Sequence, residues 1–245
     1  MLPFVAACSV APAGVEIHDP YEPVNRQVHA FNKAFDAAVL DPAGEAASRL
    51  PPEIQTAVIT FSDNAGLPNA VLNGLLQGDL EGALRNTARF ALNTTLGLMG
   101  VLDPAATVGL TEVDADFGQT LAVWGFADGA YLELPGLGPS TERDAVGIVV
   151  DFMLDPFQLT GTRAPVDYLA QGPVSVGTGA QVAEIIVERG ALDSAFDNVY
   201  SSADSYAQLR LFYLQNRRFE LGDSDRTAPV VAPEDYYFDP YEDFQ

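Results

Sequence analysis

Apolar residues recur every three or four positions through most of this chain, which is the spacing of amphipathic helices. The first such stretch stops at Asp41-Pro42 and carries Val24, Val28, Phe31, Phe35 and Val39. Asp19 can cap this helix, and Pro20 suits its first position. Similar patterns predict helices over residues 52–65, 68–78, 79–96, 141–155, 179–199 and 203–221. Because no clear alternating run predicts a strand, the sequence indicates a mainly α protein.

Two segments interrupt this helical pattern in different ways. Residues 90–102 contain no charged side chain. The stretch is too short to span a bilayer, but it suits an interfacial helix or a buried hairpin. Residues 111–140 are rich in glycine and aromatic residues, which predicts ordered loops and short turns.

The charge of the chain narrows the functional classes. Its 245 residues include 12 basic and 34 acidic side chains, a formal net charge of −22. Nucleic-acid binding needs a basic surface and is therefore excluded. Electrostatic attraction to anionic lipid needs a basic surface too and is excluded for the same reason. Yet 48% of the residues are hydrophobic, so we expect a packed or lipid-facing protein rather than a disordered one.

The beginning of the chain is similar to a lipoprotein processing site. Val5-Ala6-Ala7-Cys8 has the small residues and the cysteine of a bacterial lipobox, in which the cysteine receives lipid. Each buried methylene contributes about 0.8 kcal/mol, so several acyl chains on Cys8 would hold the protein to a bilayer. The alternative is a free thiol. We interpret residues 1–8 as a truncated lipoprotein signal and residues 9–18 as a tether.

Motifs for catalysis are absent from the sequence. It holds no G-x-S-x-G elbow, no phosphate-binding glycine run before a lysine, and no H-E-x-x-H pair. The single cysteine excludes a disulfide framework and a multi-cysteine metal site. His29 is expected to be a partly exposed residue of the first helix rather than a base. We therefore predict no enzyme, no cofactor and no metal site.

Several polar residues are embedded among the apolar positions of the predicted helices: Asn25, Asn32, Asn69, Asn73, Arg89 and Asn93. Burying an amide or a guanidinium is costly unless the group is paired or hydrated. These residues therefore either bond one helix to another or line a hydrated passage for a polar head group, with apolar helix faces toward lipid.

The carboxyl-terminal residues 222–245 are acidic and lack periodicity, which favours a disordered, solvated tail. Residues 234–245 nevertheless contain five aromatic side chains: Tyr236, Tyr237, Phe238, Tyr241 and Phe244. Aromatic residues at this density favour the alternative of a linear motif that folds onto a partner.

Four blocks of the sequence, taken in order, carry a resemblance to a known family. The first block opens with D-P-Y-E-P-V-N-R at residues 19–26 and continues to Phe31-Asn32. The second reads R-F-A-L-N-T-T-L-G-L-M-G at residues 89–100. The third runs from D-F-G-Q-T-L at residues 116–121 to Arg143-Asp144, and the fourth covers residues 205–218. Together these blocks resemble the MlaA (VacJ) family of outer-membrane lipoproteins, and the resemblance extends over residues 19–221.

The resemblance implies a mainly α fold, a single ring-like bundle of amphipathic helices and short helical hairpins with Gly-rich ordered loops, monotopic in a membrane leaflet. It implies an MlaA-like domain over residues 19–221, lipidated at Cys8 and embedded in the inner leaflet of the outer membrane on its periplasmic face. Such proteins remove glycerophospholipids from the outer leaflet and so maintain lipid asymmetry. Their implied partners are a periplasmic lipid carrier of the MlaC type and a trimeric outer-membrane porin.

The resemblance also assigns a passage wall or gate to the family's motif positions: Asn25, Phe31, Asn32, Arg89, Phe90, Asn93, Gly97, Gly100, Phe117, Gly118, Gly125, Gly129, Tyr131 and Arg143. The tail aromatics Tyr236 to Phe244 are predicted to dock the carrier. A structural lipoprotein that scaffolds porins without a lipid path is the alternative function, and an envelope hydrolase is a third.

Overall fold

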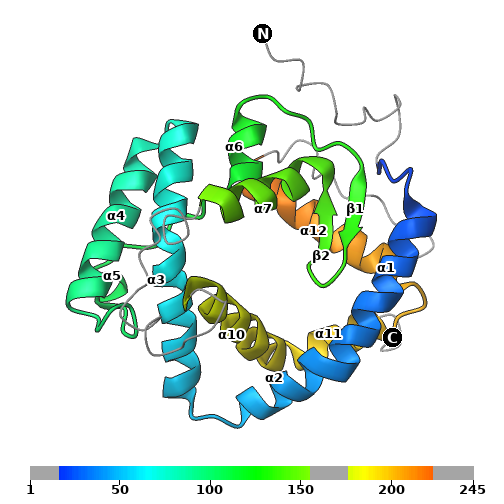
Figure 1. Ribbon diagram of the computed structural model, residues 1–245, viewed down its shortest axis with the longest axis horizontal. Coiled ribbons are helices and arrows are strands. Elements are labelled where there is room, and N and C mark those ends of the chain that lie inside the picture. The colour runs from blue at the N-terminus through cyan, green and yellow to red at the C-terminus, as the bar shows by residue number, and fades with distance from the viewer. Residues whose placement is uncertain (1–16, 155–175, 223–245) are drawn as a thin grey trace, which may run out of the picture.

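Figure 1 shows the computed structural model of the chain, which describes residues 17–154 and 176–222. Its elements are α1 (Glu22–Phe35), the π-helical η1 (Asp36–Leu40), α2 (Asp41–Ser48), α3 (Pro52–Gln77), α4 (Leu80–Thr95), α5 (Pro104–Thr107), α6 (Phe117–Val123), β1 (Tyr131–Leu134), β2 (Gly138–Thr141), α7 (Glu142–Leu154), α10 (Val176–Ala191), α11 (Asp193–Tyr200) and α12 (Ser205–Glu220). Together they make a ring, with α3 and α4 opposite α1 and the two strands, and with α10 beside α2 and α3. The predicted mainly α, ring-like architecture is confirmed.

The predicted tail motif, Tyr236 to Phe244, lies outside the described residues, as do Cys8 and most of the predicted tether. Over the ranges that are described, no helix combines the length and the apolar character needed to cross a bilayer.

The α3–α4 hairpin forms one side of the ring. The sequence predicts a break near Pro68, and this prediction is wrong, because α3 continues through Pro68 to Gln77. A proline removes one helical hydrogen bond, but α3 packs against both α4 and α10, and this tertiary packing sustains the helix. The hairpin turns at Gly78, whose φ of +80° is left-handed. Asp79 caps α4 as predicted, accepting from the backbone N of Gly82 at 2.9 Å.

The start and the end of the first helix both differ from the prediction. Asp19 does not cap α1, whose N-cap residue is Tyr21. Its carboxylate instead accepts from Asn25, from Tyr206 and from Arg210, and the last two lie on α12. The helix also does not stop at Asp41-Pro42, since η1 and α2 extend it to Ser48. The prediction used the local helical pattern alone, whereas long-range contacts determine where this helix begins and ends.

The ring closes where α10 lies across η1 and α2. Arg189 on α10 donates to both carboxylate oxygens of the buried Asp36, with Nε–Oδ1 at 2.8 Å and Nη2–Oδ2 at 3.0 Å. Gly190 lies against Gly44 of α2 so closely that a Cβ added at Gly44 would be 2.8 Å from the backbone N of Gly190. A bidentate ion pair and a glycine contact thus join segments about 150 residues apart.

A short hairpin inside the glycine-rich segment was missed by the sequence pattern. Strands β1 and β2 are antiparallel, with Tyr131 opposite Thr141 and Leu134 opposite Gly138. Each strand has only four residues, too few for alternation to be visible. Tyr131 is buried against Tyr206 and Leu214 of α12, so the hairpin anchors the last helix to the ring.

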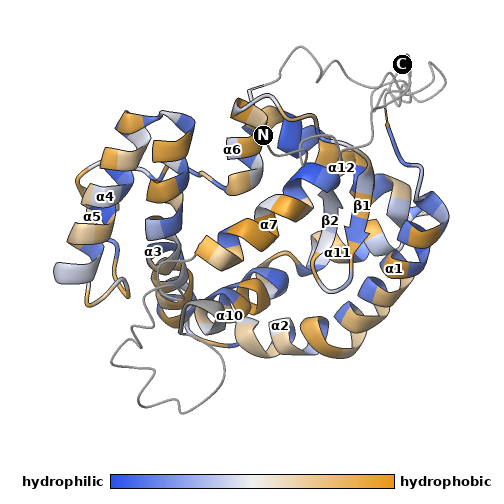
Figure 2. Cartoon of the chain, turned by 45° about the horizontal axis from the view of Figure 1, so that its top comes forward, coloured by the Kyte–Doolittle hydropathy of each residue, from blue (hydrophilic) through white to orange (hydrophobic). Residues whose placement is uncertain are grey.

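In an ordinary globular protein most buried side chains are apolar and few large apolar side chains are exposed, and here this distribution is inverted. Within the described residues, 16 polar or charged side chains are buried, compared with 12 apolar ones, and 29 large hydrophobic residues are exposed. Figure 2 shows apolar positions recurring along α1, α4 and α7. Exposed apolar residues at this density mark a surface that contacts something other than water.

Candidate functional site

Two cavities lie against the ring. The larger, of about 310 Å³, is bounded by α3, α10 and the segment before α6, and we call it the α3–α10 cavity; it is lined by Ser62, Asp63, Gly66, Ala70, Glu112, Asp114, Ala115, Asp116, Gln181 and Glu184. The second, of about 250 Å³, is the α7–α12 cavity; it is lined by Asp116, Pro139, Ser140, Asp144, Ile148, Asp151, Tyr213, Asn216, Arg217 and Glu220. Asp116 borders both.

The α3–α10 cavity is strongly acidic. Five of its ten lining residues carry carboxyl groups. Burial raises the pKa of Asp63 to about 7, and the nearby charge of Glu184 adds to the shift. Burial also raises the pKa of Glu112, although Arg89 Nη2 lies 3.7 Å from its Oε2. This cavity therefore favours neutral or cationic groups over anions.

The α7–α12 cavity is held by a clamp of opposite charges. Arg217 donates to both oxygens of Asp116 at 2.8 Å and to Asp144 Oδ1 at 3.0 Å. The hydroxyl of Tyr213 donates to Asp144 Oδ2 at 2.7 Å. Although burial opposes the effect, Arg217 lowers the pKa of Asp144. The ion pairs fix α12 to the start of α6 and to α7, and they make this wall rigid.

The predicted site residues of the first block bond α1 to the hairpin. Asn25 is buried; its Nδ2 donates to the carbonyl O of Tyr131 at 3.0 Å and its Oδ1 accepts from the backbone N of Glu133 at 3.0 Å. Asn32 donates to the carbonyl O of Leu134 at 3.0 Å and accepts from the backbone N of Gly136 at 2.7 Å. Phe31, by contrast, is 54% exposed.

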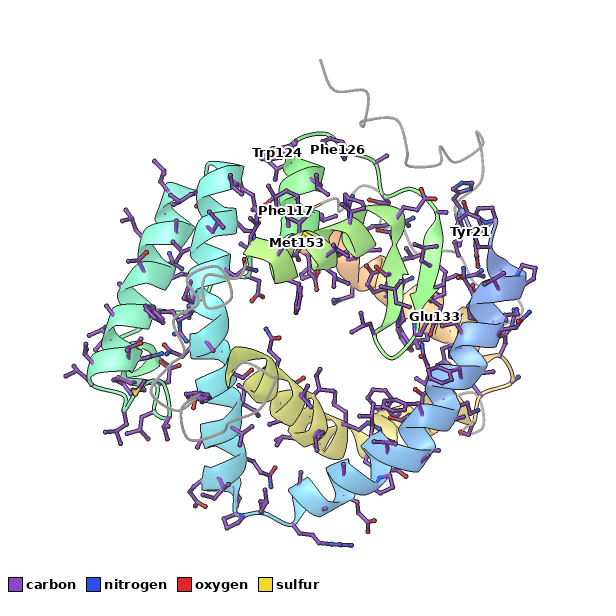
Figure 3. The ribbon with its side chains drawn as sticks, in the orientation of Figure 1. Tyr21, Phe117, Trp124, Phe126, Glu133 and Met153 are labelled. Carbon is purple, nitrogen blue, oxygen red and sulfur yellow. The ribbon has the colours of Figure 1, made fainter. Side chains whose placement is uncertain are left out.

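A cluster around Glu133 was not predicted. Figure 3 places Glu133 on β1 beside α1. His29 is buried, contrary to the prediction of partial exposure, with Nδ1 3.3 Å from Glu133 Oε1 and Nε2 3.0 Å from Ser205 Oγ. These spacings are those of a hydrolytic triad. Glu133 is also bonded by the Tyr131 hydroxyl at 2.5 Å, and neither described cavity reaches Ser205. The cluster therefore acts as a polar joint between α1, β1 and α12.

The second block holds the loop after α4. Arg89 is buried and donates to the carbonyl O of Leu110 and to Asp103 Oδ2, the latter at 3.0 Å. Asn93 Oδ1 accepts from the backbone N of Ala105 at 3.1 Å. The two glycines are needed for close approach: a Cβ at Gly97 would meet the carbonyl O of Leu102, and one at Gly100 would lie 2.6 Å from the Cβ of Asn64. Phe90 is half-buried.

The third block packs α6 against α7. Phe117 begins α6 and Trp124 follows its last residue (Figure 3), and their ring centroids are 5.8 Å apart. A Cβ at Gly118 would lie 2.5 Å from Asp144 Oδ1. Arg143 is buried; it donates to Asp128 Oδ1, and its Nη2 lies 3.2 Å from Asp144 Oδ1. Gly125 and Gly129 both have positive φ, at +89° and +75°.

None of the fourteen predicted wall or gate residues, all of which are described, lines either cavity. The polar residues among them hydrogen-bond one element of the ring to another. The residues that do line the cavities, such as Asp63, Glu184 and Arg217, were missed as site residues. Asp116, Asp144 and Arg217 carried a signal, because they lie in motif blocks, whereas Asp63 and Glu184 lie outside the blocks and single carboxylates among 34 acidic residues carry none.

A helical ring with buried ion pairs, acidic cavities and an apolar exterior defines a class of protein whose outer surface is suited to lipid rather than to water. The chain belongs to the MlaA lipoprotein family, whose family model matches residues 17–220.

Individual relatives support this assignment. The intermembrane phospholipid transport system lipoprotein MlaA of Escherichia coli is 31% identical over 82% of this chain and 77% of its own. The protein of the same description from Haemophilus influenzae is 29% identical over 85% of this chain and 81% of its own. A protein of Rickettsia felis is 35% identical over 58% of this chain, which spans 57% of that protein's length. A solved structure described as "Structural basis for maintenance of bacterial outer membrane lipid asymmetry" has a TM-score of 0.68 at 29% identity, covering 83% of this chain and 98% of its own.

Proposed function

We propose that this chain is an outer-membrane lipoprotein that removes glycerophospholipids from the outer leaflet and passes them to a periplasmic lipid carrier. The observation that carries the proposal is the inverted burial pattern, with 16 buried polar and 29 exposed large apolar side chains among the described residues. A transported phospholipid needs such a division, because its head group seeks polar surroundings while its tails seek apolar ones. The names of the E. coli and H. influenzae relatives support the same assignment.

The apolar exterior is proposed to lie in the inner leaflet of the outer membrane. Residues of the loop after α4 support this orientation, since Leu96 and Leu98 are both more than 60% exposed in a stretch without charge. The net charge of −22 opposes an anionic surface, so apolar area and the acyl chains on Cys8 supply the attachment. Cys8 and the tail lie outside the described residues, and their roles come from the sequence alone.

The passage is proposed to run through the ring, with its wall held by the fourteen motif residues. Their bonds between elements support a wall-holding role, and the glycines at positions 97, 100, 118, 125 and 129 permit close approach or turns where a gate would move. The two cavities are proposed to give the head group polar contacts, and the acidic α3–α10 cavity suits an ammonium group of the head rather than its phosphate. The chain is proposed to hand lipid to a carrier of the MlaC type, with the tail aromatics as a docking motif, and to associate with a trimeric porin.

The test is the phospholipid content of the outer leaflet in a strain that lacks this gene. We expect excess surface phospholipid, restored to the normal level by the intact protein and not by a Cys8→Ala form, because the unlipidated protein loses its anchor. Equal amounts of both forms, measured by immunoblot, control for expression. Normal asymmetry in the deletion strain contradicts the proposal and favours the alternative, a lipoprotein that scaffolds porins without a lipid path.

A further inference from the structure

The α3–α10 cavity brings together two carboxyl groups that are far apart in the chain. Asp63 lies on α3 and Glu184 on α10, both line the cavity, and their carboxyl groups are within hydrogen-bonding reach of each other. The neighbouring Ser62 donates from its Oγ to Glu184 Oε2 at 2.6 Å. An ionised carboxylate only accepts hydrogen bonds, so two carboxyl groups bond directly only when one of them holds a proton. A proton at this contact would let the two carboxyl groups bond directly.

The charged groups around this pair add negative charge rather than neutralise it. On α10, Glu188 lies one turn beyond Glu184, and the carboxyl groups of Glu112 and Asp114 reach the pair's surroundings from the segment before α6. No ion pair joins Asp63 or Glu184 to an arginine or lysine within residues 17–154 and 176–222.

The charged groups that α4 and α7 bring to α3 already have hydrogen-bond or ion-pair partners. On α4, Arg89 donates to Asp103 at 3.0 Å and lies 3.7 Å from Glu112. On α7, Asp151 accepts from Asn69 and Asn73 of α3, at 2.9 and 2.8 Å. Neither group offers the pair a countercharge, so a proton is the means by which Asp63 and Glu184 remain in contact.

We propose that Asp63 and Glu184 share one proton, and that this proton fastens α3 to α10 and makes the closure of the ring sensitive to pH around neutrality. When the proton leaves, two carboxylates repel each other across the contact. The α10 helix stays joined to α2 and η1 through Gly190 and Arg189, so it separates from α3 alone. This inference concerns the α3–α10 contact and does not depend on the proposed lipid transport.

The direction of the pH effect follows from where the proton is held. Burial, together with the charge of Glu184, raises the pKa of Asp63 to about 7 from an ordinary value of 3.8. Between these two values the folded chain keeps a proton that the unfolded chain releases. The stabilisation is therefore complete below about pH 4 and is lost as the pH rises through about 7. Carboxylates paired with arginine have the opposite effect on stability, which they lower as the pH falls. They titrate at acid pH, below the range in which Asp63 loses its proton.

The test is the thermal midpoint of the purified protein in detergent, measured at intervals from pH 6 to pH 8. We expect the wild-type midpoint to fall by several degrees over this range, and the midpoint of Asp63→Asn to stay level, because the amide donates to Glu184 at every pH. Glu184→Gln removes the same shared proton from the other side and should give the same flat profile. Glu53→Gln, at an exposed carboxyl group on α3, should retain the wild-type fall.

Infrared spectroscopy supplies a second readout that does not depend on either variant folding. The wild-type protein should show the carbonyl band of a protonated carboxyl group at pH 6 and lose it by pH 8, and Asp63→Asn should lack this titrating band. A wild-type fall in the midpoint that persists in both Asp63→Asn and Glu184→Gln overturns the proposal. Absence of the protonated band from the wild-type protein at pH 6 also overturns it.

Discussion

Replacing Asp144 by alanine is expected to destabilise the protein by about 3–5 kcal/mol, because the change leaves buried cations without their shared partner. Asp144 is buried and accepts from Arg143, Arg217, Tyr213 and Thr141. These donors come from β2, α7 and α12, so one side chain joins three elements. A loss of this size is a large part of the 5–15 kcal/mol that typically separates folded from unfolded states.

The measurement is urea unfolding of the purified variants in detergent, followed by circular dichroism. Asp144→Asn keeps an acceptor oxygen and is expected to fall between wild type and alanine. Glu45→Ala serves as the matched control, since Glu45 pairs with Arg49 at an exposed site, and such pairs contribute about 0.5 kcal/mol or less. If Asp144→Ala and Glu45→Ala cost the same, the network does not hold the ring as described.

Alanine at Gly190 is expected to destabilise the protein by about 1–3 kcal/mol through overpacking at the α2–α10 crossing. The added Cβ would meet the backbone carbonyl of Gly44, with its carbon at 2.9 Å. Backbone lies on both sides of this contact, so no flexible side chain can move away. Gly44→Ala should behave in the same way, because its Cβ would lie 2.8 Å from the backbone N of Gly190.

Gly66→Ala is the control for this crossing and should change stability in the opposite direction. Gly66 lies inside α3, and an added Cβ there meets no heavy atom within 4 Å. Replacing glycine by alanine within a helix stabilises by roughly 0.5–1 kcal/mol. The same unfolding experiment compares all three variants. If Gly66→Ala and Gly190→Ala destabilise the protein equally, then close packing at the α2–α10 crossing does not account for the effect of Gly190→Ala.

The helices that carry regular apolar spacing were predictable from the sequence, and their ends were not. The cap at Asp79 formed as predicted because capping is decided by residues three positions apart. Asp19 is equally suited to a cap, but Tyr206 and Arg210, which lie about 190 residues later, bind its carboxylate. Pro68 favours a break in an isolated helix, whereas packing against α4 and α10 carries α3 past it.

The family resemblance located the motif blocks, and the structure places their predicted wall and gate residues at joints between elements rather than along the two cavities. Asn25 and Arg89 have the polar character of passage residues, and in the folded ring they bond one backbone segment to another. The carboxylates of the α3–α10 cavity are unremarkable in sequence, since Asp63 and Glu184 acquire their chemistry only when α10 crosses α3. Which of the acids has a raised pKa depends on how the helices pack around the ring. The spacing of residues along the sequence does not show this packing.

The most direct test of a lipid path through the ring is to fill the α3–α10 cavity at Gly66 and to measure surface phospholipid. Gly66 lines this cavity, and an added Cβ meets no heavy atom within 4 Å beyond the backbone of its own helix, so the ring of a phenylalanine at this position would occupy the cavity. In a strain lacking the gene, Gly66→Ala should restore asymmetry fully, and Gly66→Phe, present at the same level and equally stable, should leave excess phospholipid in the outer leaflet. Full restoration of asymmetry by Gly66→Phe would contradict a lipid path through this part of the ring.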